Sequence, residues 1–165
     1  MDFELIKATI EYKNVIKKLM QFYMYDFSEY LKTDVEDDGS FAAYPHLEDY
    51  WTEENNRFPY IILKDQKYVG FALVRFTESE ERNYFSIAEF FIMKKYRREG
   101  IGKSIAAQIF NLHKGYWEVY QKESNKPAQI FWSRIIDEYT KGQFEERLED
   151  KRRIQTFENL SEKLW

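Results

Sequence analysis

The sequence predicts an α+β fold, in which antiparallel strands precede a strand–helix–strand–helix unit that contains one parallel strand pair. A chain of 165 residues is near the commonest domain size, and its six Gly and three Pro argue against long flexible linkers. Two β-rich runs, residues 60–63 and 68–76, flank a polar turn, which is the pattern of a hairpin. A third such run, residues 84–93, passes through a glycine-containing turn into a helical pattern, as in a parallel crossover.

A short strand and a long helix begin the chain. Phe3 and Leu5 alternate with acidic neighbours, which predicts a strand that ends near Ala8. Thr9 is then a natural cap for the helix that follows. From Tyr12 onward, apolar side chains recur at helical spacing: Ile16, Leu19, Met20 and Tyr23.

Residues 33–56 are the least regular part of the chain, with a short helix expected around residues 47–53. The acids that start at Asp34 have the spacing of a calcium loop, but Pro45 stands where such a loop requires a bidentate glutamate. His46 and His113 have no metal-ligating neighbour at helical or strand spacing, so we assign both to surface or helix-end positions. The sequence therefore predicts no metal site.

The remaining elements alternate between helix and strand. The helix after Gly100 carries an apolar stripe at steps of four, four and three: Ile101, Ile105, Ile109 and Leu112. A strand over residues 117–121 leads to a helix that begins at Asn125, whose side-chain amide can cap the first turn. That helix turns one face towards the sheet: Ala128, Phe131, Trp132 and Ile135. Beyond it, residues alternate on both sides of Asp150 and Lys151, which predicts a closing hairpin.

Composition excludes several classes of function. The net charge is −4 and 33% of residues are charged, so a large basic face for nucleic acid is not expected. The absence of cysteine removes disulfides, thiolate nucleophiles and zinc–thiolate sites. No segment has the pattern of a signal peptide or approaches the roughly 20 apolar residues that span a bilayer. We therefore expect a cytoplasmic protein with no membrane partner.

The turn between the third run and its helix has the layout of an anion-binding site. It reads Arg97-x-x-Gly100-x-Gly102, between an apolar strand and an amphipathic helix. A helix start presents unpaired N–H groups and a partial positive charge, so main-chain donors alone can bind a phosphate. Glycines, which have no Cβ, let the backbone approach a pyrophosphate closely.

This turn resembles the cofactor-binding motif of the GNAT superfamily of N-acetyltransferases. Downstream, Asn125-x-x-Ala128-x-x-Phe131-Trp132 is similar to the stretch that these enzymes carry on their next helix. The resemblance covers nearly the whole chain, and residues 87–103 are its most specific part. It implies a single domain over residues 1–165, with a mostly antiparallel twisted sheet, helices on both faces, and one parallel strand pair that splays apart to hold acetyl-CoA.

The resemblance also implies which residues meet the cofactor. The strand before the turn would bond the pantetheine arm through the backbone of Phe90, Phe91 and Ile92. The phosphates would meet the turn itself: Arg97, Arg98, Glu99, Gly100, Ile101, Gly102 and Lys103. Asn125 and Trp132 complete the expected set. Glu99 departs from the basic or neutral residue that the family has at its position.

Trp132 stands where these enzymes commonly have a tyrosine that bonds or protonates the departing thiol. Indole donates one N–H but exchanges no proton near neutral pH, so Trp132 cannot act as that acid. Tyr139 and Tyr120 are candidate substitutes. The replacement also makes a second function class credible, a CoA-binding sensor without effective catalysis. A third class is a protein-interaction domain that uses its surface tyrosines.

Acetyl transfer to an amine needs a base, because a lysine-like amine with a pKa of about 10.4 is mostly protonated at pH 7. Glu89 and Glu118 each interrupt an apolar strand, where a charged side chain costs desolvation energy, and either is a candidate. For the acceptor we expect Tyr25, Asp26 and Tyr30, which follow the first strand and helix. The predicted reaction is direct transfer from acetyl-CoA to a primary amine of a cationic small molecule or peptide. A homodimer is a further partner that we consider.

Overall fold

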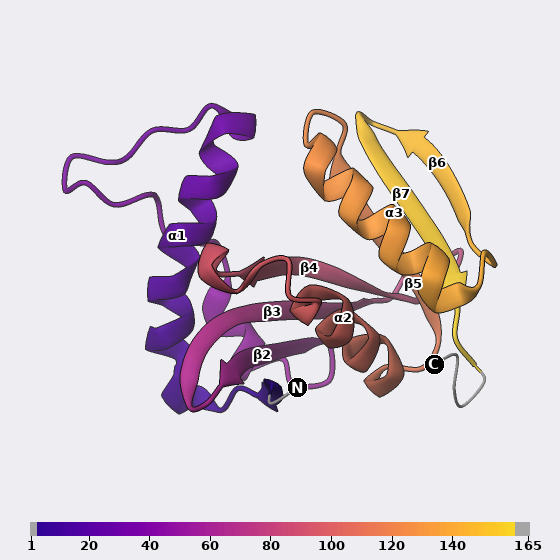
Figure 1. Ribbon diagram of the computed structural model, residues 1–165, viewed down its shortest axis with the longest axis horizontal. Coiled ribbons are helices and arrows are strands. Elements are labelled where there is room, and N and C mark those ends of the chain that lie inside the picture. Colours follow the sequence, from indigo (N-terminus) through magenta and orange to yellow (C-terminus); the bar gives the residue numbers. More distant parts are fainter. Residues whose placement is uncertain (1–2, 161–165) are drawn as a thin grey trace.

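The computed structural model describes residues 3–160 of the protein, which form one seven-stranded sheet of order β1-β2-β3-β4-β5-β7-β6 (Figure 1). The strands are β1 (Phe3–Lys7), β2 (Arg57–Lys64), β3 (Lys67–Thr77), β4 (Tyr84–Ile92), β5 (Tyr116–Lys122), β6 (Glu145–Glu149) and β7 (Arg152–Glu158). The helices are α1 (Lys13–Leu31), α2 (Ile101–Leu112) and α3 (Lys126–Thr140), with 3-10 turns η1 (Ile10–Tyr12), η2 (Leu47–Trp51) and η3 (Lys94–Tyr96). Within these residues β4–β5 is the one parallel pair, so the predicted α+β class is confirmed.

Two-residue turns close both predicted hairpins. Asp65 and Gln66 join β2 to β3, and Asp150 and Lys151 join β6 to β7. All four residues have positive φ, between +47° and +62°. Positive φ at both central positions gives the turn a twist that matches the flanking strands, and this sets the antiparallel register.

At the N-terminus, the prediction for Thr9 is wrong. Its hydroxyl donates to the Glu11 carboxylate at 3.1 Å rather than capping a helix, and η1 separates it from the start of α1 at Lys13. The predicted first strand is confirmed, because β1 pairs with β2 from Phe3 to Lys7.

Helices cover both faces of the sheet. Buried residues of α1 and η2 pack on one face, against Phe71, Leu73 and Phe91, while α2 and α3 pack on the other. The predicted stripe of α2 is partly wrong, because Leu112 is 60% exposed. Leu112 points in nearly the same direction around the helix as Ile101 and Ile105, which are buried, so its exposure follows from its position as the last residue of α2, beyond the packed part of the stripe.

The sheet divides between β4 and β5. Among the described residues, these strands register at Phe85 and Trp117 alone, and beyond that pair they diverge, with α2 and α3 beside them (Figure 1). A bulge interrupts β4 just past the division. Leu73 lies opposite Glu89 whereas Val74 lies opposite Ile87, so Ala88 is the extra residue. The divergence leaves one side of β4 without a strand partner near the middle of the molecule.

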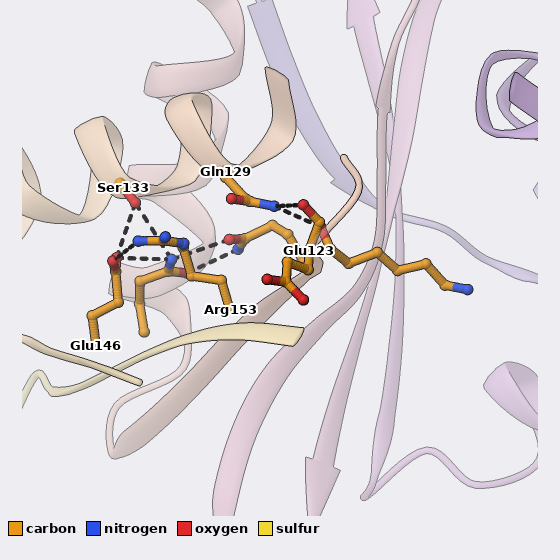
Figure 2. A network of polar contacts seen from close by, with 8 residues as sticks. Glu123, Gln129, Ser133, Glu146 and Arg153 are labelled. Carbon is orange, nitrogen blue, oxygen red and sulfur yellow. Dashed lines mark hydrogen bonds and ion pairs between the residues drawn. The ribbon is translucent and has the colours of Figure 1, made fainter. Parts of the chain in front are cut away.

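A polar network joins α3 to the last two strands (Figure 2). Gln121 and Gln155 are buried and exchange amide hydrogen bonds of 2.8 and 3.0 Å. Gln155 and Ser133 both donate to the Glu146 carboxylate, at 3.2 and 3.0 Å, and Arg153 forms an ion pair with it. Burial opposes the charge of Glu146, but these donors outweigh it and lower the pKa of Glu146. The network holds α3, β5, β7 and β6 together as one side of the division.

Candidate functional site

The turn that leads into α2 presents backbone amides. The hydrogen-bond ladder of α2 begins where Ser104 N–H donates to the Gly100 carbonyl at 3.1 Å, so the amides of Ile101 and Gly102 come before it. Arg98 and Gly100 have φ of +68° and +79°, a left-handed conformation that turns the chain sharply. A Cβ added to Gly100 would meet no atom within 4 Å. Space for a ligand is therefore open beside Gly100, as the sequence predicts for a phosphate site.

Arg97 is bound within the protein. Its Nε donates to the Ile92 carbonyl at 2.6 Å, and its Nη2 pairs with Asp26 Oδ2 at 2.6 Å. Lys94 approaches the same Asp26 carboxylate at 3.7 Å. Asp26, expected to meet the acceptor, ties α1 to the turn.

The other charged side chains of the turn also meet protein groups. Glu99 pairs with Lys64 at 3.4 Å, and Lys103 forms an ion pair with Glu138 on α3. Arg98 is the exception, because its side chain is exposed, so the main-chain amides and the Arg98 guanidinium are the groups of the turn left to bind an anion.

Aromatic rings, rather than open space, surround Gly102. A Cβ at this position would lie 2.9 Å from the Phe131 ring, which also approaches Phe90 at a centroid distance of 5.9 Å. Trp132 packs edge-on against Phe90 at 5.1 Å and is 7% exposed. Asn125 caps α3, accepting a hydrogen bond from Ala128 N–H at 3.2 Å. Gly102, Asn125 and Trp132 thus join α2 and α3 to the sheet beside the turn.

The unpaired side of β4 offers further main-chain groups. Phe71 lies opposite Phe91, and Met93 N–H donates to Val69 O, so the backbone groups of Phe91 and Met93 face β3. Those of Phe90 and Ile92 therefore face the side on which β5 has diverged. The Ile92 carbonyl already accepts a hydrogen bond from Arg97 Nε. The Phe90 N–H hydrogen-bonds the Tyr23 hydroxyl, so the Phe90 carbonyl and the Ile92 N–H are the groups placed to bond an extended ligand, which fits the predicted position of a pantetheine arm.

Glu89 occupies a half-buried position on the face covered by α1. Tyr44 Oη donates to Glu89 Oε1 at 3.2 Å, and the Tyr23 hydroxyl hydrogen-bonds the same carboxylate. Burial raises the pKa of Glu89 to about 7, although the two tyrosines act to lower it. A carboxylate that is half ionised near neutral pH is suited to accept a proton.

Glu118 lies on the same face as Glu89 but in different surroundings. Trp117 and Val119 pack towards α2 and α3, which turns Glu118 to the opposite side, and it pairs with Arg147 Nη2 at 3.5 Å. It lines two adjoining hollows of about 1320 and 280 Å³, whose linings do not include Glu89. The structure thus separates the two candidate carboxylates, which the sequence treats alike.

The expected acceptor residues all lie near the end of α1, where Tyr30 interacts electrostatically with Asp26. Tyr25 is 67% exposed on α1, whereas the Tyr30 ring packs on Phe27. Sequence reasoning missed Tyr23 and Tyr44 as contacts of Glu89. Tyr23 has the helical spacing of a core residue, and Tyr44 lies in the irregular segment, so neither pattern indicates a polar role.

His113 ends α2 as its C-cap residue, and Tyr60 Oη lies 2.6 Å from its Nε2. Burial, together with the charge of Lys7, lowers the pKa of His113 to about 4. His46 precedes η2 and lies 3.2 Å from Asp49. Across residues 3–160, no three potential metal ligands are grouped closely enough to hold an ion. No helix in that range is both long and apolar enough to cross a membrane.

The chain matches a family model and a set of solved structures. The family model described as Acetyltransferase (GNAT) family matches residues 16–136. None of the curated protein sequences compared with the chain matches it.

Among solved structures, the chain resembles a GNAT-family acetyltransferase from Listeria monocytogenes, with a TM-score of 0.68, 12% identity and 95% of each chain covered. It also resembles an acetyltransferase from Thermus thermophilus, with a TM-score of 0.67, 12% identity, and 96% of this chain and 98% of that chain covered. A third is the PaiA N-acetyltransferase from Thermoplasma acidophilum, solved in complex with coenzyme A, with a TM-score of 0.63, 13% identity, and 96% and 100% coverage. At these identities the structural matches establish the fold. Because the family model spans more than half of the chain, the protein belongs to the GNAT family of acetyltransferases.

Proposed function

We propose that the protein transfers the acetyl group of acetyl-CoA directly to a primary amine, with Glu89 as the general base. The observation that carries this proposal is the half-buried Glu89 carboxylate, which two tyrosines hydrogen-bond beside the bulge of β4. Membership of the acetyltransferase family supplies the reaction class, and the complex of the Thermoplasma acidophilum protein with coenzyme A supports the choice of cofactor.

The turn and β4 divide the work of cofactor binding. Amides between Arg98 and Lys103 would hold the phosphates, where the start of α2 favours negative charge. The Phe90 carbonyl and the Ile92 N–H would bond the arm along the unpaired side of β4. Acetyl-CoA supplies an activated acyl group when bound there. These residues place it beside the strand that carries Glu89.

Glu89 suits the base role better than Glu118. A base works best when its pKa is near the working pH, and the pKa of Glu89 is about 7. Glu118 is held by the Arg147 guanidinium, which would have to be displaced before the carboxylate could accept a proton. Glu89 would take one proton from the ammonium group and leave a neutral nitrogen nucleophile. We propose that the thiolate departs unaided: Trp132 is buried among aromatic rings and is no acid near neutral pH, and the hydroxyl of Tyr139, a candidate substitute, is buried and donates to Asn111 Oδ1.

The surroundings of Glu118 favour a cationic acceptor. Carboxylates outnumber guanidinium groups in the lining of the larger hollow: Glu80, Glu81, Glu118, Glu145, Glu149 and Glu158 against Arg82 and Arg147. The smaller hollow includes Tyr120, which interacts electrostatically with Tyr44 and so lies towards Glu89. Its lining has three guanidinium groups (Arg75, Arg147 and Arg152) against two carboxylates (Glu118 and Glu149), so the attraction for a cation comes from the larger hollow. We propose that the amine of a cationic small molecule or peptide reaches Glu89 along this route.

Measurement of CoA release against a panel of primary amines tests the function. Acetyl transfer to at least one cationic amine, with a large loss in Glu89→Gln and a smaller loss in Glu118→Gln, is the expected result. The burial of Trp132, which takes no part in proton exchange, favours a rival function as a CoA-binding sensor. Stabilisation of the protein by acetyl-CoA in a thermal melt, with no release of CoA for any amine, would favour the sensor.

A further inference from the structure

Tyrosines from two segments outside the sheet meet at Glu89. Tyr23 lies in the middle of α1, and Tyr44 lies in the irregular segment between α1 and η2. Both rings are half-buried and both hydroxyls bond the same carboxylate, Tyr44 at 3.2 Å. Glu89 itself is on β4, 45 residues from Tyr44 in the sequence. The Glu89 carboxylate is therefore held by side chains from α1 and from the segment before η2, not by residues of its own strand.

Each tyrosine is fixed by contacts of its own. The ring of Tyr23 packs edge-on against Phe71 and Phe91, at centroid distances of 5.7 and 5.8 Å. The segment that carries Tyr44 is bound to α1 through Phe41, three residues before Tyr44. Phe41 N–H donates to Gln21 Oε1 at 2.8 Å, and Gln21 Nε2 donates back to Phe41 O at 3.2 Å. This reciprocal pair, which we call the Gln21 latch, holds an otherwise irregular segment against the helix.

We propose that Tyr44, with Tyr23, is a positioning residue that orients the Glu89 carboxylate towards the acceptor amine, and that the Gln21 latch holds Tyr44 in place. The proposal rests on the proposed function, in which Glu89 is the base. It adds a role for residues 32–46, which lie outside every helix and strand.

The physical reason is that phenol hydroxyls donate to the ionised carboxylate and stabilise it, while burial does the opposite. With two donors, Glu89 directs its remaining lone pairs away from the tyrosines. Removal of one donor should raise the pKa of Glu89 by about one unit, which is a tenfold loss of the ionised form below neutral pH. Activity would then fall at low pH and recover at high pH, whereas general damage to the structure would lower it at every pH.

The groups that face this site from each packed element are known. Tyr23 comes from α1, Tyr44 from the connecting segment and Tyr50 from η2, and all three interact with Glu89. Arg75 on β3 and Tyr120 on β5 interact with Tyr50 and Tyr44 respectively. Tyr50 Oη is buried and its polar neighbour is the Arg57 guanidinium rather than the Glu89 carboxylate. Loss of that hydroxyl removes no bond to Glu89, so Tyr50→Phe is a matched control.

The decisive experiment follows the Glu89 carboxyl carbon by NMR as a function of pH, in protein labelled with ¹³C-glutamate and without substrates. The signal is assigned by its absence in Glu89→Gln. Tyr44→Phe and Tyr23→Phe should each move the titration about one unit upward, Gln21→Ala should move it in the same direction, and Tyr50→Phe should leave it in place. The low-pH limb of kcat/KM should shift by the same amount in each variant.

The outcomes separate this inference from the function on which it rests. An unmoved titration in Tyr44→Phe, with Glu89→Gln still inactive, would overturn the positioning role alone. An unmoved titration in Gln21→Ala would overturn the latch. Full activity in Glu89→Gln would overturn Glu89 as the base, and with it a catalytic purpose for the tyrosine contacts.

Discussion

Acetyl transfer should rise about tenfold between pH 6 and pH 8 as Glu89 loses its proton. Burial raises the pKa of this carboxyl to about 7. About a tenth of the protein then has an ionised Glu89 at pH 6, and about nine tenths at pH 8. An ordinary, exposed glutamate would be fully ionised across this range and would give no such rise. The size of the expected rise in rate therefore follows from the burial of the Glu89 side chain.

The assay measures kcat/KM for one amine between pH 5.5 and pH 9, with CoA quantified after quenching so that detection does not depend on pH. Two acceptors with different amine pKa values distinguish the ionisation of the enzyme from that of the substrate. The part of the pH profile that is due to the amine moves with the amine pKa, whereas the part due to Glu89 does not. Glu89→Gln should lose the limb near pH 7, and Glu118→Gln should keep it. A limb that persists in Glu89→Gln, or a wild-type profile that is flat from pH 6 to pH 8, would refute the reasoning.

Three further predictions concern packing and stability. Gly102→Ala places a Cβ 2.9 Å from the Phe131 ring. The overpacking should cost about 1–3 kcal/mol, which exceeds the gain of about 0.5–1 kcal/mol from replacing a helical glycine, so the melting temperature should fall. Addition of Phe131→Leu should restore it, and a double variant no more stable than the single one would contradict this. In Gly70→Ala a Cβ would lie 1.9 Å from the Phe91 carbonyl oxygen, so β3 and β4 should fail to pair, and a cooperative melt like that of the wild type would exclude this clash. His113, with a pKa lowered to about 4 against about 6.5 when unfolded, should reduce the free energy of unfolding by about 2 kcal/mol between pH 7 and pH 5, since the unfolded chain binds the extra proton. The raised pKa of Glu89 acts in the opposite direction over the same range, so the test is a comparison of variants: by urea denaturation, the change in free energy of unfolding from pH 7 to pH 5 should be about 2 kcal/mol more favourable in His113→Gln than in the wild type, and an equal change in both would contradict this.

Local patterns predicted most of the fold because each pattern reports a short-range preference. The hairpins at Asp65 and Asp150 follow from alternation around polar pairs that adopt positive φ. The Arg97–Gly102 spacing located the start of α2 because it stands between an apolar strand and an apolar stripe at helical spacing, and the helix begins at Ile101 after the N-cap Gly100. Leu112 shows the limit of such patterns. Its direction around the helix is that of the buried Ile101 and Ile105, but it is the last residue of α2, and how far along the helix the packing extends depends on tertiary structure.

The contacts of the candidate site depended on tertiary structure that no local pattern contains. Glu89 is noticeable in the sequence as a charge within an apolar strand, but its tyrosine partners come from α1 and from the segment before η2. Asp26 shows the same dependence, while its expected role at the acceptor stays a prediction. It was expected at the acceptor, yet the fold brings Arg97 to it across 71 residues of sequence. Charge and ring composition indicated a polar site without specifying which side chains meet.

We propose that main-chain amides at the start of α2, together with the adjacent strand β4, bind coenzyme A. Titration of ¹⁵N-labelled protein with CoA tests it most directly, since every residue from Arg98 to Lys103 has a backbone N–H. We expect the largest changes in amide chemical shift at those residues and at Phe90 and Ile92. Saturable shifts elsewhere with none in this turn, or no shift at millimolar CoA, would contradict it.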